Sequence, residues 1–152
     1  MVDVLKVYGI SQNPDTKDYI MVLQDGFCKK CGEEYTDVKY KWCKPCQIDN
    51  LKTTNLTSGN EKIDNFVQEM QLKIVDANDI VFEWIPYSQF SNIKKIGRGG
   101  FATVYSAIWK DGPLTYMFGT NKYIKKYSSN FKVVLRCLNN SQNITDEFLN
   151  EV

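Results

Sequence analysis

The sequence predicts an α+β fold, in which an antiparallel sheet is joined to a small zinc-stapled module and one amphipathic helix. Three observations support this prediction. Residues after position 90 are rich in β-branched and aromatic types, apolar residues recur at helical spacing between positions 58 and 74, and four cysteines form two close pairs. A chain of 152 residues can hold one sizeable core and a small satellite module.

The composition excludes several classes of function. The chain has 43% hydrophobic and 24% charged residues, which is typical of a folded globular protein. It has no histidine, so it cannot by itself carry a Ser-His-Asp triad or a mixed Cys/His zinc finger. Because 19 basic residues balance 18 acidic ones, we expect neither nucleic acid nor a membrane surface as a partner.

The first segment, residues 1–26, is predicted to form a β-hairpin. Apolar runs at residues 4–7 and 19–23 flank the sequence Asn13-Pro14-Asp15, which suits a type I turn. The start of the chain shows no basic segment followed by a long apolar stretch, and no apolar run is long enough to span a bilayer. We therefore expect an intracellular, cytoplasmic location.

The next segment, residues 27–48, is predicted to form a zinc knuckle with four cysteine ligands. Two Cys-x-x-Cys pairs, separated by eleven residues, supply the ligands Cys28, Cys31, Cys43 and Cys46. Structural zinc prefers four tetrahedral thiolates, and the neighbouring lysines offset the negative charge of such a site. A redox-active dithiol and an iron site are the alternatives. Cys137 lies apart on an apolar strand and is predicted to be a buried thiol.

Residues 49–80 are predicted to form a polar linker followed by an amphipathic helix. Ser58 and Glu61 have the spacing of a capping box, which predicts the start of the helix. One helical face carries the apolar residues Ile63, Phe66, Val67, Met70 and Ile74. We expect this face to pack on a neighbouring core, and the alternative is that residues 58–74 bind a protein partner.

The last segment, residues 82–152, is predicted to be mainly strands. Its strand-forming runs are residues 90–96, 102–109 and 131–138. A polar, aromatic-rich excursion at residues 110–130 separates the second strand from the third. Thr145 is predicted to cap a short final helix, because two acidic residues follow it and favour the positive end of a helix dipole.

A glycine-rich loop joins the first two of these strands. It is formed by Ile96, Gly97, Gly99, Gly100, Phe101, Ala102 and Val104. The loop differs from that of a dinucleotide-binding fold, because the residues after it favour a strand rather than a helix. Such a loop between antiparallel strands lets backbone amides approach the phosphates of a nucleotide; a plain hairpin turn without a ligand is the alternative.

With this loop, residues 82–152 resemble a truncated N-terminal lobe of the eukaryotic protein kinases, closest to the tyrosine-kinase-like group. The loop matches the family pattern G-x-G-x-[FY]-G-x-V, with Ala102 at the third glycine position. The resemblance implies an antiparallel kinase-like N-lobe sheet, the start of helix C, and weak ATP binding. It also implies three further nucleotide-site residues, which are Val134, Arg136 and Glu151.

The sequence departs from the kinase pattern in two of these residues. Arg136 stands where the family has a lysine that contacts phosphates, and Val134 replaces a small alanine beside the adenine. The chain also has no His-Arg-Asp catalytic loop and no Asp-Phe-Gly triplet. We therefore do not expect phosphoryl transfer from this chain alone.

The hairpin predicted at residues 1–26 is similar to the fourth and fifth strands of a kinase lobe. One hypothesis is that it is a remnant of an upstream kinase-like repeat. The other is that it folds back and completes the three-stranded sheet, whose edge is otherwise open.

Three functions remain open at this point. The first is a kinase-family chain that binds ATP weakly, the second is a pseudokinase-like interaction module, and the third is a protein-binding scaffold built on the zinc knuckle and the amphipathic helix. We favour the kinase family, without activity in isolation.

Overall fold

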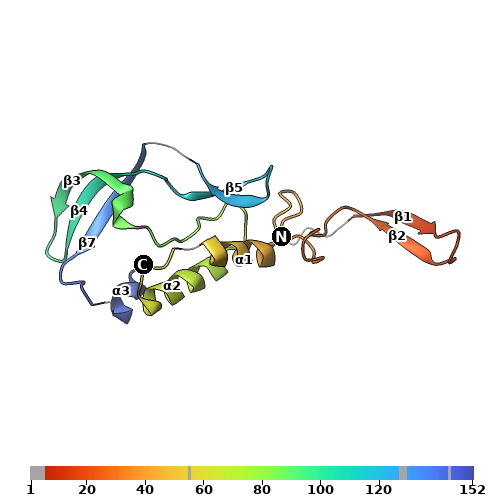
Figure 1. Cartoon of the computed structure of the whole chain (residues 1–152), viewed down its shortest axis with the longest axis horizontal. Helices are drawn as coiled ribbons and strands as arrows, with labels where there is room; N and C mark the ends of the chain where they lie inside the picture. Colours follow the sequence, from red (N-terminus) through yellow and green to blue (C-terminus); the bar gives the residue numbers. More distant parts are fainter. Residues whose placement is uncertain (1–5, 55, 127–129, 144) are drawn as a thin grey trace.

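The computed structural model describes residues 6–54, 56–126, 130–143 and 145–152 (Figure 1). It confirms an α+β fold with antiparallel sheets. The strands of the described part are β1 (Val7–Gln12), β2 (Tyr19–Leu23), β3 (Phe90–Arg98), β4 (Ala102–Trp109), β5 (Leu114–Met117), β6 (Lys122–Lys125) and β7 (Phe131–Leu138). Its helices are α1 (Lys44–Thr54), α2 (Glu61–Leu72) and α3 (Asp146–Asn150), with one 3-10 turn at Tyr87–Gln89.

Strands β3, β4 and β7 form one antiparallel sheet, with β4 in the centre. The three strands predicted after position 90 are therefore confirmed, and β3 extends two residues further than expected. The register between β4 and β7 is unbroken from the pair Ala102 and Leu138 to the pair Trp109 and Phe131. The register between β3 and β4 shifts twice, and Asn92 has a positive φ of 51° at the first irregularity.

The excursion between β4 and β7 contains a second antiparallel pair, β5 and β6. The sequence predicted only a loop here, because each strand has four residues and polar side chains surround them. Tyr116 of β5 is buried, and Asn121 adopts a φ of 52° just before β6. The hairpin therefore contributes to the core instead of remaining a surface excursion.

The main core joins three segments that are far apart in the sequence. Its buried residues are Trp42, Ile48, Leu51, Ile74, Ala77, Val81 and Tyr116. They come from the cysteine-rich segment and α1, from the chain that follows α2, and from β5. The zinc knuckle predicted at residues 27–48 thus shares its hydrophobic core with Tyr116, far along the chain.

Helix α1 occupies part of the region that the sequence predicted as a linker. It begins at Lys44, within the second cysteine pair, and buries Ile48 and Leu51. Its sequence shows little periodicity, because these are the only large aliphatic residues on an otherwise polar helix. Its stability therefore comes from tertiary packing.

Helix α2 confirms the predicted amphipathic helix, but its start differs. Asn60 is the N-cap, and its side-chain oxygen accepts a hydrogen bond from the Ile63 N–H at 3.2 Å. The capping box at Ser58 is wrong, because Gly59 turns the chain with a φ of 80° and the Ser58 hydroxyl bonds to Asn60 instead.

The apolar stripe of α2 packs inside the protein. Val67 and Ile74 are buried, although Ile74 lies just after the end of the helix. Phe66 meets Phe82 edge to face, with ring centroids 5.6 Å apart. These contacts bear out the core-packing interpretation, while a protein partner for residues 58–74 stays a prediction.

Strands β1 and β2 form the predicted hairpin, but they pair only with each other. The hypothesis that the hairpin folds back onto the three-stranded sheet is wrong for this structure. Figure 1 shows why: the hairpin projects from the end of the molecule opposite to β3, β4 and β7, because residues 24–27 lead directly into the cysteine loops. Large apolar side chains of the hairpin are exposed, including Ile10 at 78% and Tyr19 at 79%. Residues 1–5 of this prediction lie outside the described residues.

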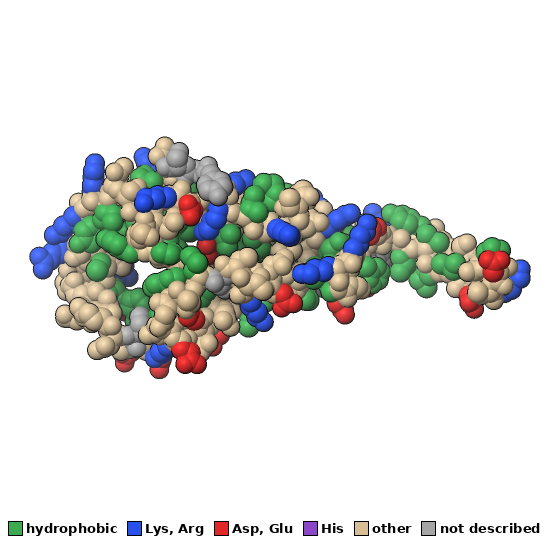
Figure 2. Space-filling view, in the orientation of Figure 1, with side chains coloured by type: hydrophobic (Ala, Val, Ile, Leu, Met, Phe, Trp, Pro, Cys, Tyr) green, Lys and Arg blue, Asp and Glu red, His purple; other side chains and the backbone are tan. Residues whose placement is uncertain are grey.

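The space-filling view shows an opening between the sheet and the helices (Figure 2).

Cys137 of β7 is exposed, so the prediction of a buried thiol is wrong. The reason is that β7 is an edge strand with half-buried or exposed residues along its whole length.

Among the described residues, no helix combines the length and the apolar character needed to cross a bilayer.

Candidate metal centre

The first cysteine pair lies on a tight loop closed by backbone hydrogen bonds. Phe27 and Glu34 form an isolated antiparallel bridge at its base, and the Cys28 N–H donates to the Glu33 carbonyl at 2.7 Å. Inside the loop, the Gly32 N–H donates to the Cys28 carbonyl at 2.8 Å. Gly32 has a φ of 78°, which a residue with a side chain rarely adopts, so the glycine permits this turn.

The second cysteine pair lies at the start of α1. Cys43 precedes the helix and Cys46 is in its first turn, where the Gln47 N–H donates to the Cys43 carbonyl at 3.0 Å. The Lys44 N–H donates to the Thr36 hydroxyl at 3.1 Å, which satisfies one of the free donors of the helix start. The sequence offered no signal for this cap, because Thr36 is eight residues away.

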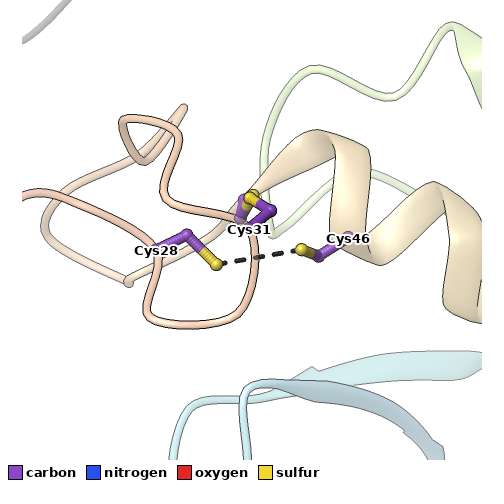
Figure 3. Close-up of side chains that lie close together, drawn as sticks. Cys28, Cys31 and Cys46 are labelled. Atoms are coloured by element: carbon purple, nitrogen blue, oxygen red, sulfur yellow. Dashed lines mark hydrogen bonds between the residues drawn. The ribbon is translucent and has the colours of Figure 1, made fainter.

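The four sulfur atoms converge between this loop and the first turn of α1. Figure 3 shows Cys28, Cys31 and Cys46 of this cluster. They all lie within 4.8 Å of one another, with Cys28 Sγ 3.8 Å from Cys46 Sγ and Cys31 Sγ 3.5 Å from Cys43 Sγ. A tetrahedral zinc ion with Zn–S bonds of about 2.3 Å requires sulfur atoms about 3.8 Å apart. The spacing therefore fits a tetrathiolate site, and it is far longer than the bond of a disulfide, about 2.05 Å.

The surroundings of the sulfurs differ from one cysteine to the next. Cys28, Cys43 and Cys46 are buried, whereas Cys31 is exposed. Burial raises the pKa of Cys43 to about 11, and burial followed by the neighbouring thiols raises the pKa of Cys46. Burial also opposes ionisation of Cys28, but hydrogen bonds from the backbone of Cys31 and Lys30 and from nearby thiols lower its pKa to about 7.

This donor set suits a closed structural site. Four cysteines close together can hold a zinc ion, and a metal that takes all four sulfurs has no free position for a substrate. The arrangement brings together all four of the residues that the sequence predicted as metal ligands.

The glycine-rich loop forms the tight connection between β3 and β4. The Gly99 N–H donates to the Ala102 carbonyl at 2.8 Å, and the Asn139 N–H donates to the Phe101 carbonyl at 3.0 Å. Ile96 and Phe101 are exposed at 59% and 86%, while Ala102 is buried. Gly100 is exposed at the tip, so the loop presents backbone and apolar side chains to solvent.

The other predicted nucleotide-site residues are only partly brought together. Gly97 lies opposite Val104 on β4, and Val104 lies opposite Arg136 on β7. Val134 lies opposite Ser106 and is 65% exposed. These residues therefore occupy neighbouring positions on one sheet.

Glu151 belongs to a different element and is the C-cap of α3. Among the described residues, no ion pair joins Glu151 to Arg136. Lys62 of α2 instead forms an exposed ion pair with Asp146 of α3 at 2.6 Å. Helix α3 is thus connected to α2 in this structure.

Comparison with known proteins gives no match. No protein-family model matches the chain, and neither the curated proteins nor the solved structures include a significant match.

Proposed function

We propose that the cysteine-rich segment binds one structural Zn²⁺ and that this ion holds the core of the protein together. The sulfur spacing carries this proposal, because two sulfur pairs from separate loops already stand at the distances of a tetrahedral site. A redox-active dithiol site needs only one reactive pair of cysteines, whereas here two cysteine pairs converge on a single point. This arrangement favours a metal site over a redox site.

The metal would connect the loop of the first cysteine pair to the start of α1. The loop of the first pair is small and polar, and its bridge of Phe27 and Glu34 supplies little buried area. The second pair is attached to α1, whose Ile48 and Leu51 enter the core. Trp42 lies directly before the second pair and is fully buried. Binding of the ion therefore fixes the position from which Trp42 enters the core.

The experiment measures zinc content and thermal stability of the whole chain. Protein purified without added metal should hold one equivalent of zinc, and a strong chelator should lower its melting temperature. Cys46→Ser should lose the metal, whereas Cys137→Ser is the control, because Cys137 lies outside the cluster. Less than half an equivalent of zinc, together with no effect of the chelator on melting, would overturn the proposal.

A second proposal concerns the sheet of β3, β4 and β7. It is that this sheet corresponds to part of a kinase-type N-lobe and binds ATP weakly through its glycine-rich loop. The observation in its favour is the glycine hairpin, which lies at one end of an antiparallel sheet with Arg136 opposite Val104 on the next strand. Phosphoryl transfer is not part of the proposal, because the chain lacks the carboxylates that hold magnesium and the substrate hydroxyl.

Thermal shift with ATP and Mg²⁺ tests this second proposal. The wild-type chain should show a small increase in melting temperature, and the double variant Val134→Ala with Arg136→Lys should show a larger one. The control is Lys132→Arg. It replaces one basic side chain of the same strand by another and leaves Val134 and Arg136 unchanged. If neither the wild type nor the double variant responds to ATP, the loop is a plain hairpin turn, and the protein-binding scaffold remains as the function to test.

A further inference from the structure

One face of the β1 and β2 hairpin is apolar and open to solvent. In the register of the two strands, Ile10 lies opposite Met21 and Gln12 lies opposite Tyr19. Residues that are directly opposite, or two apart on one strand, share a face of a sheet, so Ile10, Tyr19 and Met21 form one surface. These three residues are 78%, 79% and 65% exposed. We call this surface the hairpin face.

The other face of the hairpin has smaller side chains and is less exposed. Gly9 lies opposite Val22 there, and Ser11 lies opposite Ile20. Val22 and Ile20 are 41% and 44% exposed, well below the residues of the hairpin face. A two-stranded hairpin is only marginally stable in water unless an apolar face is covered. Within the described chain, β1 and β2 pair only with each other, so the hairpin face is the surface that lacks a cover.

The exposed apolar area is large enough for a weak specific interface. Tyr8 lies two residues before Ile10, at the irregular start of β1, and adds a fourth large side chain that is 68% exposed. Side chains of this size and exposure present on the order of 500 Å² together. Two such surfaces would bury about 1,000 Å² in all, which is near the lower limit for a specific interface between proteins.

The two ends of the hairpin carry opposite charge. Lys6 stands at the base, directly before β1, whereas Asp15, Lys17 and Asp18 stand at the turn and sum to one negative charge. All four residues are exposed, and no ion pair engages them among the described residues. Figure 2 shows charged side chains gathered at the tip of the projecting hairpin, with apolar side chains along its length. Two hairpins that lie antiparallel would therefore bring the acidic tip of each against the basic base of the other.

We propose that the hairpin face binds the same face of a second copy of this chain, with the two hairpins antiparallel across a two-fold axis. The contact is isologous, so each copy uses the same residues and each charge complement occurs twice. The apolar centre between ends of opposite charge is already self-complementary, which favours a second copy over a different protein. The small buried area predicts a reversible dimer rather than a permanent one. This interaction surface is separate from the cysteine cluster and goes beyond the structural zinc site.

Sedimentation equilibrium of the whole zinc-loaded chain, over the micromolar range of concentration, tests the proposal. The wild type should shift from monomer to dimer as its concentration rises. Ile10→Lys should raise the dissociation constant at least about tenfold, because the symmetry places two ammonium groups in the apolar contact. Ile80→Lys is the matched control, because Ile80 is 88% exposed but lies between α2 and β3, outside the hairpin. It should associate as the wild type does.

A charge reversal tests the antiparallel arrangement. Asp18→Lys should weaken association several-fold, and the double variant Lys6→Asp with Asp18→Lys should recover it, because the opposite charges of the two ends are restored. The proposal is overturned if the wild type stays monomeric throughout the range, if Ile10→Lys and Ile80→Lys associate equally, or if the double variant associates no better than Asp18→Lys. Growth beyond the dimer with rising concentration would also overturn it, since that result indicates addition of strands at the open edges of the hairpin.

Discussion

The indole N–H of Trp42 donates a hydrogen bond to the hydroxyl oxygen of Tyr123, 3.1 Å away and 81 positions later in the chain. A second bond runs in the opposite direction, from the Tyr116 hydroxyl to the Lys41 carbonyl at 3.3 Å. The cysteine-rich segment and the β5 and β6 hairpin are thus connected by polar contacts as well as by the apolar core.

Replacement of Trp42 should destabilise the protein more than replacement of an exposed tryptophan. Trp42→Phe removes the hydrogen bond to Tyr123 and leaves a void in a site that is fully buried. We expect a loss of about 2–3 kcal/mol in the free energy of unfolding. Urea titration of the zinc-loaded protein measures it. Trp84→Phe is the control, because Trp84 is 38% exposed; equal losses in the two variants would contradict the role of Trp42.

A side chain at Gly32 should weaken zinc binding. Gly32 has a φ of 78°, a conformation that costs about 1–2 kcal/mol for an L-residue, and its N–H donates the hydrogen bond that closes the first cysteine loop. Gly32→Ala should therefore lower zinc affinity about tenfold in competition with a chromophoric chelator.

The matched control for this variant is Gly100→Ala. Gly100 has no positive φ, and nothing lies within 4 Å of the Cβ that the substitution adds. Its zinc affinity should equal that of the wild type. If both variants bind zinc as the wild type does, strain at Gly32 plays no part in the metal centre.

The ion pair of Glu83 and Lys125 should be a strong local contribution to stability. Glu83 is 10% exposed at its side chain and also accepts a hydrogen bond from the Leu114 N–H at 3.0 Å. Lys125 donates to the Gly112 carbonyl at 2.9 Å and lies over the ring of Trp109. Glu83→Ala leaves the ammonium group without its counter-charge, so we expect a loss of about 3 kcal/mol in urea titration.

The control for this pair is Glu61→Ala at the exposed start of α2. It removes the same charge from the surface, and its effect should stay below about 1 kcal/mol. A loss for Glu83→Ala as small as that for Glu61→Ala would show that the pair contributes little.

Stability should decline in alkaline solution because of two tyrosines. Burial raises the pKa of Tyr116 from 10.0 to about 12, with the nearby Tyr123 as the next cause, and burial also raises the pKa of Tyr123. A folded pKa above the unfolded one means that the neutral form is favoured in the folded state. The contribution is complete below pH 10 and is lost as the pH rises toward 12.

Ultraviolet titration of tyrosine ionisation checks this prediction. Tyr116→Phe should remove the most basic component of the titration curve and should reduce the dependence of melting temperature on pH above 10. Tyr19→Phe, on the exposed hairpin, should leave both unchanged. Identical titration of Tyr116 and of the exposed tyrosines would contradict the prediction.

Local patterns in the sequence predicted much of the secondary structure and all four candidate ligands. Strands β4 and β7 were predictable because β-branched and aromatic residues are frequent in both. The metal ligands were predictable because a Cys-x-x-Cys pair defines its own local loop. Helix α1 was not, because Ile48 and Leu51 become a core face only when segments from elsewhere cover them.

The contact between α1 and the turn of the β5 and β6 hairpin shows the same limit. Gln47 Nε2 donates to the Asn121 carbonyl at 2.8 Å, although the two residues lie far apart in the sequence and neither belongs to a motif. Their proximity depends on the β5 and β6 hairpin, whose four-residue strands leave only a weak periodic signal. Cys137 illustrates the converse error: its apolar strand suggested burial, but nothing in the described part of the structure covers that position.

The distribution of the core along the chain has a consequence for the order of folding. During synthesis, the cysteine loops leave the ribosome well before Tyr116 and Tyr123, which complete the core around Trp42. Protein synthesis proceeds at about 5–20 residues per second, so Trp42 is made several seconds before Tyr116 and Tyr123. Early capture of zinc would keep the cysteine loops closed in that interval, and would shorten the time for which an unpaired aromatic surface is open to aggregation.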